Sequence, residues 1–106
     1  MNRYGSRWLP PATRLAIYLR DKFQCQYCGR DLRAARRDEV TLDHLICRNA
    51  GGSHCPSNLV TACRTCNSKR QDKTLKEFAS DEAQRRIRNA IRRKLNVQLA
   101  KGLLAA

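Results

Sequence analysis

Two Cys-x-x-Cys pairs bracket the middle of this 106-residue chain. The first pair is Cys25 and Cys28, and the second is Cys63 and Cys66. Four thiolates in two such pairs are a strong signal for a tetrahedral zinc ion. Thirty-four residues lie between Cys28 and Cys63, more than the roughly 15–20 of an ordinary zinc ribbon, so the insert must itself be structured. We therefore expect one structural Zn²⁺ that clamps the two ends of this insert together.

Other interpretations of the cysteines remain open. A redox Cys-x-x-Cys or a disulfide pair is a weaker alternative, because the sequence shows no thioredoxin-like βαβ pattern. Cys47 and Cys55 lie in the insert at a spacing that does not fit a zinc knuckle. They could be buried or reactive thiols, a Cys47–Cys55 link, or part of a second metal site helped by His54, although His54 fits a surface loop better.

The insert and the residue after the last cysteine carry further chemistry: Asp43, His44, Asn58 and Asn67. Histidine titrates near neutral pH and can take a proton from water, and carboxylate and amide oxygens suit a hard divalent ion. Adjacent strand residues point to opposite faces, so Asp43 and His44 can converge only if the strand ends or bends there. The plainer alternatives are a capping Asp43, a surface His44 and a helix-capping Asn67.

Short elements should position these residues. Pro10 and Pro11 open a helix over 12–21, and alternating polarity predicts a strand over 39–43. A loop over 48–57, with Gly51, Gly52 and Pro56 as breakers, leads to a second strand over 58–62. A helix should then run from about residue 66 toward residue 78.

The C-terminal part predicts one long basic helix over about 81–101, capped by Ser80 and ended by Gly102, with residues 103–106 frayed. Its apolar residues recur mostly at steps of four and are expected to face the core: Ala83, Ile87, Ala90, Ile91, Leu95 and Leu99. The length predicts a single domain over 1–106, with a core at about 20–78.

The formal net charge is +13, from 22 Lys and Arg against nine Asp and Glu, spread along the chain. Such a field on a small domain attracts nucleic acid, although a solubilising surface or a ribosomal-type protein would also explain it. We find no apolar run of about 18 residues and no apolar leader at residues 1–5, which predicts a cytoplasmic protein without a membrane span.

Taken together, five signals resemble the cysteine-flanked version of the HNH endonuclease family over roughly residues 20–74. They are the segments 25–29, 42–45, 51–52, 58–60 and 63–67. The resemblance implies an α+β class, namely a small ββα-metal domain with flanking helices and a structural zinc held by four cysteines. It also implies a source in phages or mobile elements, with a partner protein from that machinery such as a DNA-packaging component.

Carried over to this chain, the resemblance makes His44 the general base and Asp43 a ligand of a catalytic ion. Asn58 would hold the loop and orient His44. Asn67 takes the third position as a second ligand, which makes this an H-N-N variant suited to Mg²⁺ or Mn²⁺.

The resemblance also implies that Lys69 or Arg70 contacts a substrate phosphate. Spacing places Arg85, Arg88 and Arg92 on one helix face, where they could follow a DNA strand. The expected function is a metal-dependent DNA endonuclease. The alternative is a zinc-stapled nucleic-acid-binding module without catalysis.

Overall fold

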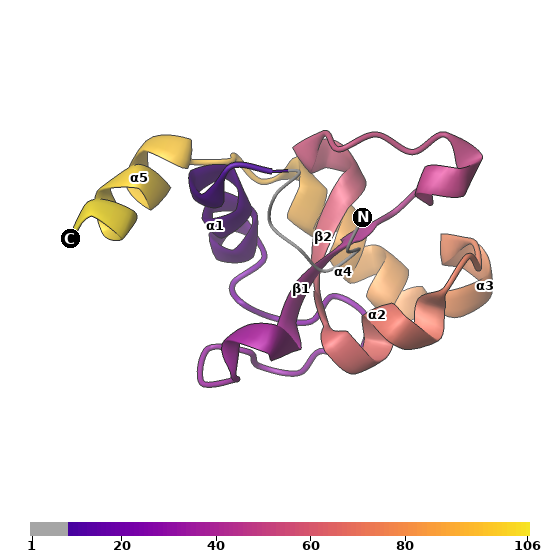
Figure 1. Cartoon of the computed structure of the whole chain (residues 1–106). Coiled ribbons are helices and arrows are strands. Elements are labelled where there is room, and N and C mark those ends of the chain that lie inside the picture. Colours follow the sequence, from indigo (N-terminus) through magenta and orange to yellow (C-terminus); the bar gives the residue numbers. More distant parts are fainter. Residues whose placement is uncertain (1–8) are drawn as a thin grey trace.

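A computed structural model describes residues 9–106, and the prediction made for residues 1–5 lies outside this range. The centre is a two-stranded antiparallel sheet, formed by β1 (Val40–His44) and β2 (Leu59–Cys63). The register pairs Thr41 with Ala62 and Asp43 with Val60. Within the described residues, helices surround this sheet (Figure 1), so the predicted α+β class is confirmed.

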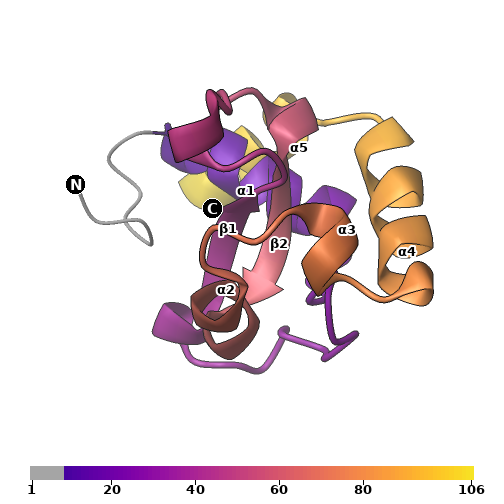
Figure 2. The ribbon, with the colours of Figure 1, turned by 90° about the vertical axis from the view of Figure 1, so that its right-hand side faces the viewer.

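Helix α1 (Pro11–Arg20) packs on one face of the sheet. Ile17 meets Leu42 and Leu59 there, in a core to which Leu95 adds from the far end of the chain. Two prolines open α1 because proline has no N–H to leave unbonded in the first turn. In Figure 2 this helix lies behind the strands and α4 to their right.

The other face of the sheet is covered by the first cysteine knuckle and by α4 (Asp81–Arg92). Val60 and Ala62 of β2 pack against Ala83 and Ile87 of α4. Ser80 caps α4 by accepting from the N–H of Ala83, as predicted. The apolar stripe of α4 is therefore core, because it is the side of the helix that the sheet covers.

The helix expected over 66–78 is two helices, α2 (Arg64–Arg70) and α3 (Leu75–Phe78). Gln71 ends α2 with a φ of 50°, a backbone conformation that cannot continue a helix. Thr74 then starts α3 with a capping box to Glu77. The sequence contains the capping signal of α3, but it has no glycine or proline between residues 66 and 78 that would indicate the break.

The prediction of a single basic helix over 81–101 is also wrong, because the structure has two helices there. The chain is extended at Arg93, whose side chain donates to the carbonyl oxygen of Arg20 at 3.2 Å. Asn96 then caps α5 (Val97–Ala105), which packs against α1 and contains Gly102. Residues 103–105 are helical and not frayed.

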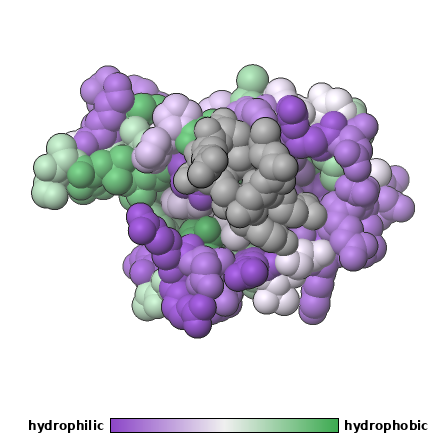
Figure 3. Space-filling model, viewed as in Figure 1, coloured by the Kyte–Doolittle hydropathy of each residue, from purple (hydrophilic) through white to green (hydrophobic). Residues whose placement is uncertain are grey.

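The break between α4 and α5 means that the last residue of the predicted apolar stripe, Leu99, does not face the sheet. Leu99, Leu103 and Leu104 are each more than half exposed on α5. Figure 3 shows this apolar surface at the left end of the molecule, while hydrophilic residues predominate on the rest of the surface that is coloured by hydropathy in this view. None of the helices in residues 9–106 is long and apolar enough to cross a membrane.

Candidate metal centre and active site

The four knuckle cysteines come together at one point. Their sulfur atoms all lie within 4.8 Å of one another, and Sγ of Cys28 is 4.0 Å from Sγ of Cys63. Ligands about 2.3 Å from a tetrahedral zinc lie about 3.8 Å apart, so the set fits this ion. Among the described residues, this is the one cluster of three or more His, Cys, Asp or Glu side chains with that geometry.

Local backbone geometry explains why the knuckles form. Gly29 has a φ of 81° and its N–H donates to the carbonyl oxygen of Cys25, closing the turn after the second ligand. The N–H of Cys66 points at Sγ of Cys63 over 3.4 Å. Such N–H groups stabilise thiolates, which are the form that binds metal.

The thiols differ in their surroundings. Burial raises the pKa of the Cys25 thiol to about 11, against weaker opposing hydrogen bonds from backbone N–H groups. Burial and the neighbouring sulfurs of the cluster raise the pKa of Cys66. Burial also opposes ionisation of Cys28, but the N–H of Arg30 and the nearby sulfurs outweigh it and lower the pKa of that thiol.

Asp43 lies in β1, next to a buried arginine. Nη1 of Arg70 is 2.7 Å from Oδ2 of Asp43, and the hydroxyl of Tyr27 donates to the same oxygen. Burial and the Asp43 charge raise the pKa of Tyr27, so its phenol stays protonated and can donate. Tyr27 sits between Cys25 and Cys28, so the contact ties the cysteine knuckle to the end of β1.

Arg70 also gathers the backbone around this point. Its guanidinium donates to the carbonyl oxygens of His44 at 2.9 Å, Leu45 at 2.7 Å and Lys73 at 2.9 Å. The prediction that Lys69 or Arg70 contacts a phosphate therefore fails for Arg70, because its side chain is fully buried. Lys69 is exposed on α2 and keeps that predicted role.

Asn67 is buried inside α2, whose N-cap is Cys63, so the alternative of Asn67 as a helix cap is wrong. Its Nδ2 donates to Oγ1 of Thr41 at 3.0 Å and to the carbonyl oxygen of Leu42 at 3.2 Å. These bonds use the amide hydrogens and fix the orientation of the group. The amide oxygen is the atom that could serve as a ligand.

His44, the last residue of β1, has a different partner. Its Nε2 lies 2.9 Å from Nδ1 of His54, and the two ring centroids are 5.1 Å apart. The side chain of Asp43 thus contacts Arg70 and Tyr27, whereas the ring of His44 contacts His54. The sequence placed His54 in the loop but gave no signal that it meets His44.

Asn58 braces the loop that carries His54. Its Oδ1 accepts from the N–H of Ile46 at 2.8 Å, and its Nδ2 donates to the carbonyl oxygens of Ile46 at 3.2 Å and Ser53 at 2.9 Å. Gly52 allows the close approach, because a Cβ there would lie 1.7 Å from the Ile46 carbonyl oxygen. This arrangement fits the loop-holding role predicted for Asn58.

The two remaining cysteines lie apart from the cluster. Cys47 is half-buried, with its sulfur 3.7 Å from the carbonyl oxygen of Gln71, and Cys55 is exposed. Both are free thiols. Their placement agrees with the first of the three interpretations, a buried or reactive thiol.

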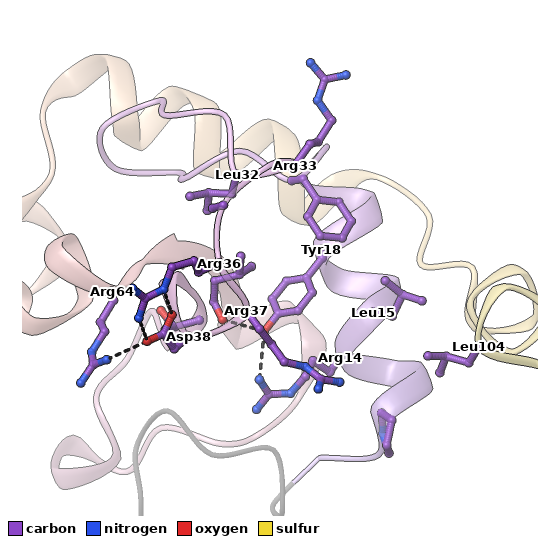
Figure 4. A pocket seen from close by; sticks show the side chains of 15 residues that line it. Arg14, Leu15, Tyr18, Leu32, Arg33, Arg36, Arg37, Asp38, Arg64 and Leu104 are labelled. Carbon is purple, nitrogen blue, oxygen red and sulfur yellow. Dashed lines mark hydrogen bonds and ion pairs between the residues drawn. The ribbon is translucent and has the colours of Figure 1, made fainter.

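Basic side chains gather at two surfaces. Arg85, Arg88 and Arg92 are all exposed on α4. A groove between α1, the 32–38 segment and α2 has an arginine-rich rim (Figure 4), made by Arg14, Arg33, Arg36, Arg37 and Arg64. Asp38 pairs with two of these at 2.8 and 3.5 Å, and Asp31 pairs with Arg33 at 2.7 Å, so part of the rim is already neutralised.

A family model described as HNH endonuclease matches residues 25–82, more than half of the chain. The match begins at the first cysteine of the cluster and covers both strands, α2 and α3. No curated protein and no solved structure gives a significant match.

Proposed function

The chain belongs to the HNH endonuclease family, and on this basis we propose that it is a metal-dependent DNA endonuclease that hydrolyses phosphodiester bonds. The observation that carries the proposal is the meeting of β1 and α2 beside the cysteine cluster. Asp43 and His44 end the strand there, and Asn67 is bonded to the same strand from α2. A protein that only binds nucleic acid does not need this set.

The donor atoms fit a hard ion. Asp43 and Asn67 offer one carboxylate and one amide oxygen, which suit Mg²⁺ or Mn²⁺, ions that keep several waters and also take substrate phosphate oxygens. Such an ion supplies positive charge for the phosphate and the leaving oxygen. The four sulfurs suit zinc instead, so the catalytic ion would bind at a separate place.

In this proposal His44 is the general base. Its ring takes a proton from water, the resulting hydroxide bonds to phosphorus, the bond to the leaving oxygen breaks, and that oxygen takes a proton from solvent. Asn58 holds the loop beside the base. Lys69 and the exposed arginines of α4 contact phosphates, which makes binding largely independent of sequence.

A second candidate is a zinc-stapled nucleic-acid-binding module without catalysis. One observation favours it: Oδ2 of Asp43 is already bonded to Arg70 and Tyr27. A carboxylate has two oxygens with several acceptor positions, and these two contacts restrict one of those oxygens. The phage or mobile-element source implied by the resemblance remains a prediction.

A cleavage assay on supercoiled plasmid distinguishes the endonuclease from the non-catalytic module. Purified protein is incubated with Mg²⁺ or Mn²⁺, with and without EDTA, beside a His44→Ala variant whose zinc content and DNA affinity are measured in parallel. We expect metal-dependent nicking or linearisation by the wild type and a loss of about 10²–10⁴-fold in the variant, with DNA binding nearly unchanged. Binding without cleavage by both proteins would favour the non-catalytic module.

A further inference from the structure

The groove between α1, the 32–38 segment and α2 has no part in the proposed reaction. The site residues Asp43, His44 and Asn67 do not line it. Its volume is about 1130 Å³, which is above the roughly 300–1,000 Å³ of pockets that hold a small molecule. The size of the groove therefore suits a segment of polypeptide chain better than a small ligand.

The two ends of the groove differ in chemistry. In Figure 4, Leu15 of α1 and Leu104 of α5 lie at one end, and Arg36 and Arg64 lie at the other, with Arg37 between them. Leu15 is half-buried, whereas Leu104 is 53% exposed and is part of the apolar surface of α5. An occupant that matches the groove must offer apolar surface at one end and negative charge at the other.

The arginines of the groove are only partly neutralised. Five of them line it, and among the described residues Asp38 is the one acidic residue that does so. Asp38 is shared between Arg36 at 2.8 Å and Arg64 at 3.5 Å. A guanidinium has five N–H donors, and the side chain of Arg36 is 80% exposed, so donors remain accessible to further carboxylates.

Charge decides which occupant fits. A second copy of this chain carries the same formal charge of +13, so two copies would repel each other. Residues 1–8 contain Arg3 and Arg7 but no Asp or Glu, so they bring no negative charge either. DNA presents phosphates, which match the arginines of the groove but leave its apolar end without a partner.

We propose that the groove is a docking site for an acidic segment of a partner protein. An apolar side chain of this segment packs against Leu15 and Leu104, and its carboxylates pair with the arginines at the other end. Arginine suits this role because its planar fork of donors matches a carboxylate. No residue of α4 lines the groove, so the partner leaves the arginines proposed to contact DNA uncovered.

Peptide selection on the full, zinc-loaded chain tests the chemistry of the occupant. Short random peptides displayed on phage are selected at about 0.15 M salt, where charges separated by more than about 8 Å are screened. Excess duplex DNA is present to occupy the DNA-binding surface. We expect the enriched peptides to combine Asp or Glu with Leu, Ile or Phe. Fluorescence anisotropy then gives the affinity of one synthetic representative.

Matched variants locate the bound peptide, each checked for zinc content and melting temperature. Two triple Arg→Gln variants remove the same charge from the groove and from α4, at Arg36, Arg37 and Arg64 and at Arg85, Arg88 and Arg92. We expect peptide affinity to fall about tenfold in the groove variant and to change little in the α4 variant.

The apolar end has its own pair of variants. Leu104→Gln should weaken peptide binding about fivefold, because part of the buried apolar area is lost. Leu99 is 51% exposed on the same helix but does not line the groove, so Leu99→Gln should bind the peptide as the wild type does.

Several results would overturn the docking site without affecting the nuclease assignment, which the plasmid assay tests separately. Enriched peptides without acidic residues would do so even if the variants did not fold. Equal losses in the two triple variants would show binding by net charge alone. Peptide binding only after removal of residues 1–8 would assign the groove to that segment. A greater loss of DNA affinity in the groove variant than in the α4 variant would assign it to nucleic acid.

Discussion

Arg70 donates to Oδ2 of Asp43 across 2.7 Å, in a place where their side chains are 0% and 4% exposed. Although burial opposes its charge, Tyr27 and Asp43 hold the pKa of Arg70 above its usual value. The positive charge of Arg70 balances the negative charge of the buried Asp43 carboxylate. Its bonds to the carbonyl oxygens of His44 and Leu45 also fix the end of β1. We infer that it orients Asp43 and touches no substrate.

Replacing Arg70 should therefore destabilise the fold. We expect Arg70→Met to cost about 3–5 kcal/mol of unfolding free energy, because it leaves the Asp43 carboxylate buried without its partner. Arg70→Lys should fall between this variant and the wild type, since lysine keeps the charge but loses the fork of donors. Urea denaturation of zinc-loaded protein measures these changes.

Lys69→Met is the matched control, one residue earlier on α2 and exposed. Its unfolding free energy should stay within about 0.5 kcal/mol of the wild type. Its affinity for DNA should fall. If Arg70→Met were as stable as Lys69→Met, the buried pair would not have the structural role assigned to it.

One zinc per chain should be bound by the four cysteines. Cys25→Ser should lose the ion and with it the fold, because binding free energy of a structural zinc is folding free energy in a small domain. Elemental analysis and circular dichroism measure both effects. Cys55→Ser, exposed and outside the cluster, should keep one zinc and the wild-type spectrum. Folded Cys25→Ser protein without zinc would contradict the assignment.

Two neighbouring glycines provide a test of the loop that carries His54. Gly52→Ala forces a Cβ against the Ile46 carbonyl oxygen, so the loop must move and the contacts of Asn58 with it. We expect a large loss of cleavage with zinc retained. At Gly51 nothing lies within 4 Å of a Cβ, and only its φ of 89° is unfavourable.

Gly51→Ala should therefore cost about 1–2 kcal/mol in stability and leave most of the cleavage rate intact. The comparison uses the same substitution one residue apart, so it separates the close approach at Gly52 from backbone strain in general. Equal cleavage rates in the two variants would show that the contact between Gly52 and Ile46 does not position the site.

The exposed arginines of α4 should contribute to DNA affinity through phosphates. Among the described residues, Arg85, Arg88 and Arg92 form no ion pair. Changing all three to Gln should weaken binding to any duplex alike and flatten the salt dependence by roughly one unit per lost contact. Cleavage at saturating DNA should persist. Affinity for two unrelated duplexes across a salt series measures this.

Arg33→Gln with Arg36→Gln is the comparison for the groove. Both arginines already face an aspartate, Asp31 or Asp38, so we expect a smaller change in the salt slope. A larger change than in the α4 variant would move the DNA interface from α4 to the groove. An unchanged slope in the α4 variant would assign its arginines to solvent.

The sequence was enough for the parts that depend on residue type and local spacing. The cysteine pairs predicted the cluster, and the two β-strands began and ended within one residue of their predicted bounds. Ser80 was recognised as a cap because capping needs a side-chain oxygen three residues before its donor. Asp43, His44, Asn58 and Asn67 were predicted as site residues because the family motif is also defined by residue type and spacing.

Only the tertiary structure decided which distant groups meet. Arg70 resembles a surface cation in sequence, and its burial depends on Asp43, Tyr27 and three carbonyl oxygens that the fold brings around it. At the break after α4, Arg93 contacts the end of α1, far from it in the sequence. His54 is an ordinary loop residue until the bracing by Asn58 puts it against His44. Local propensity cannot predict such contacts, because each is set by the packing of segments far apart in the chain.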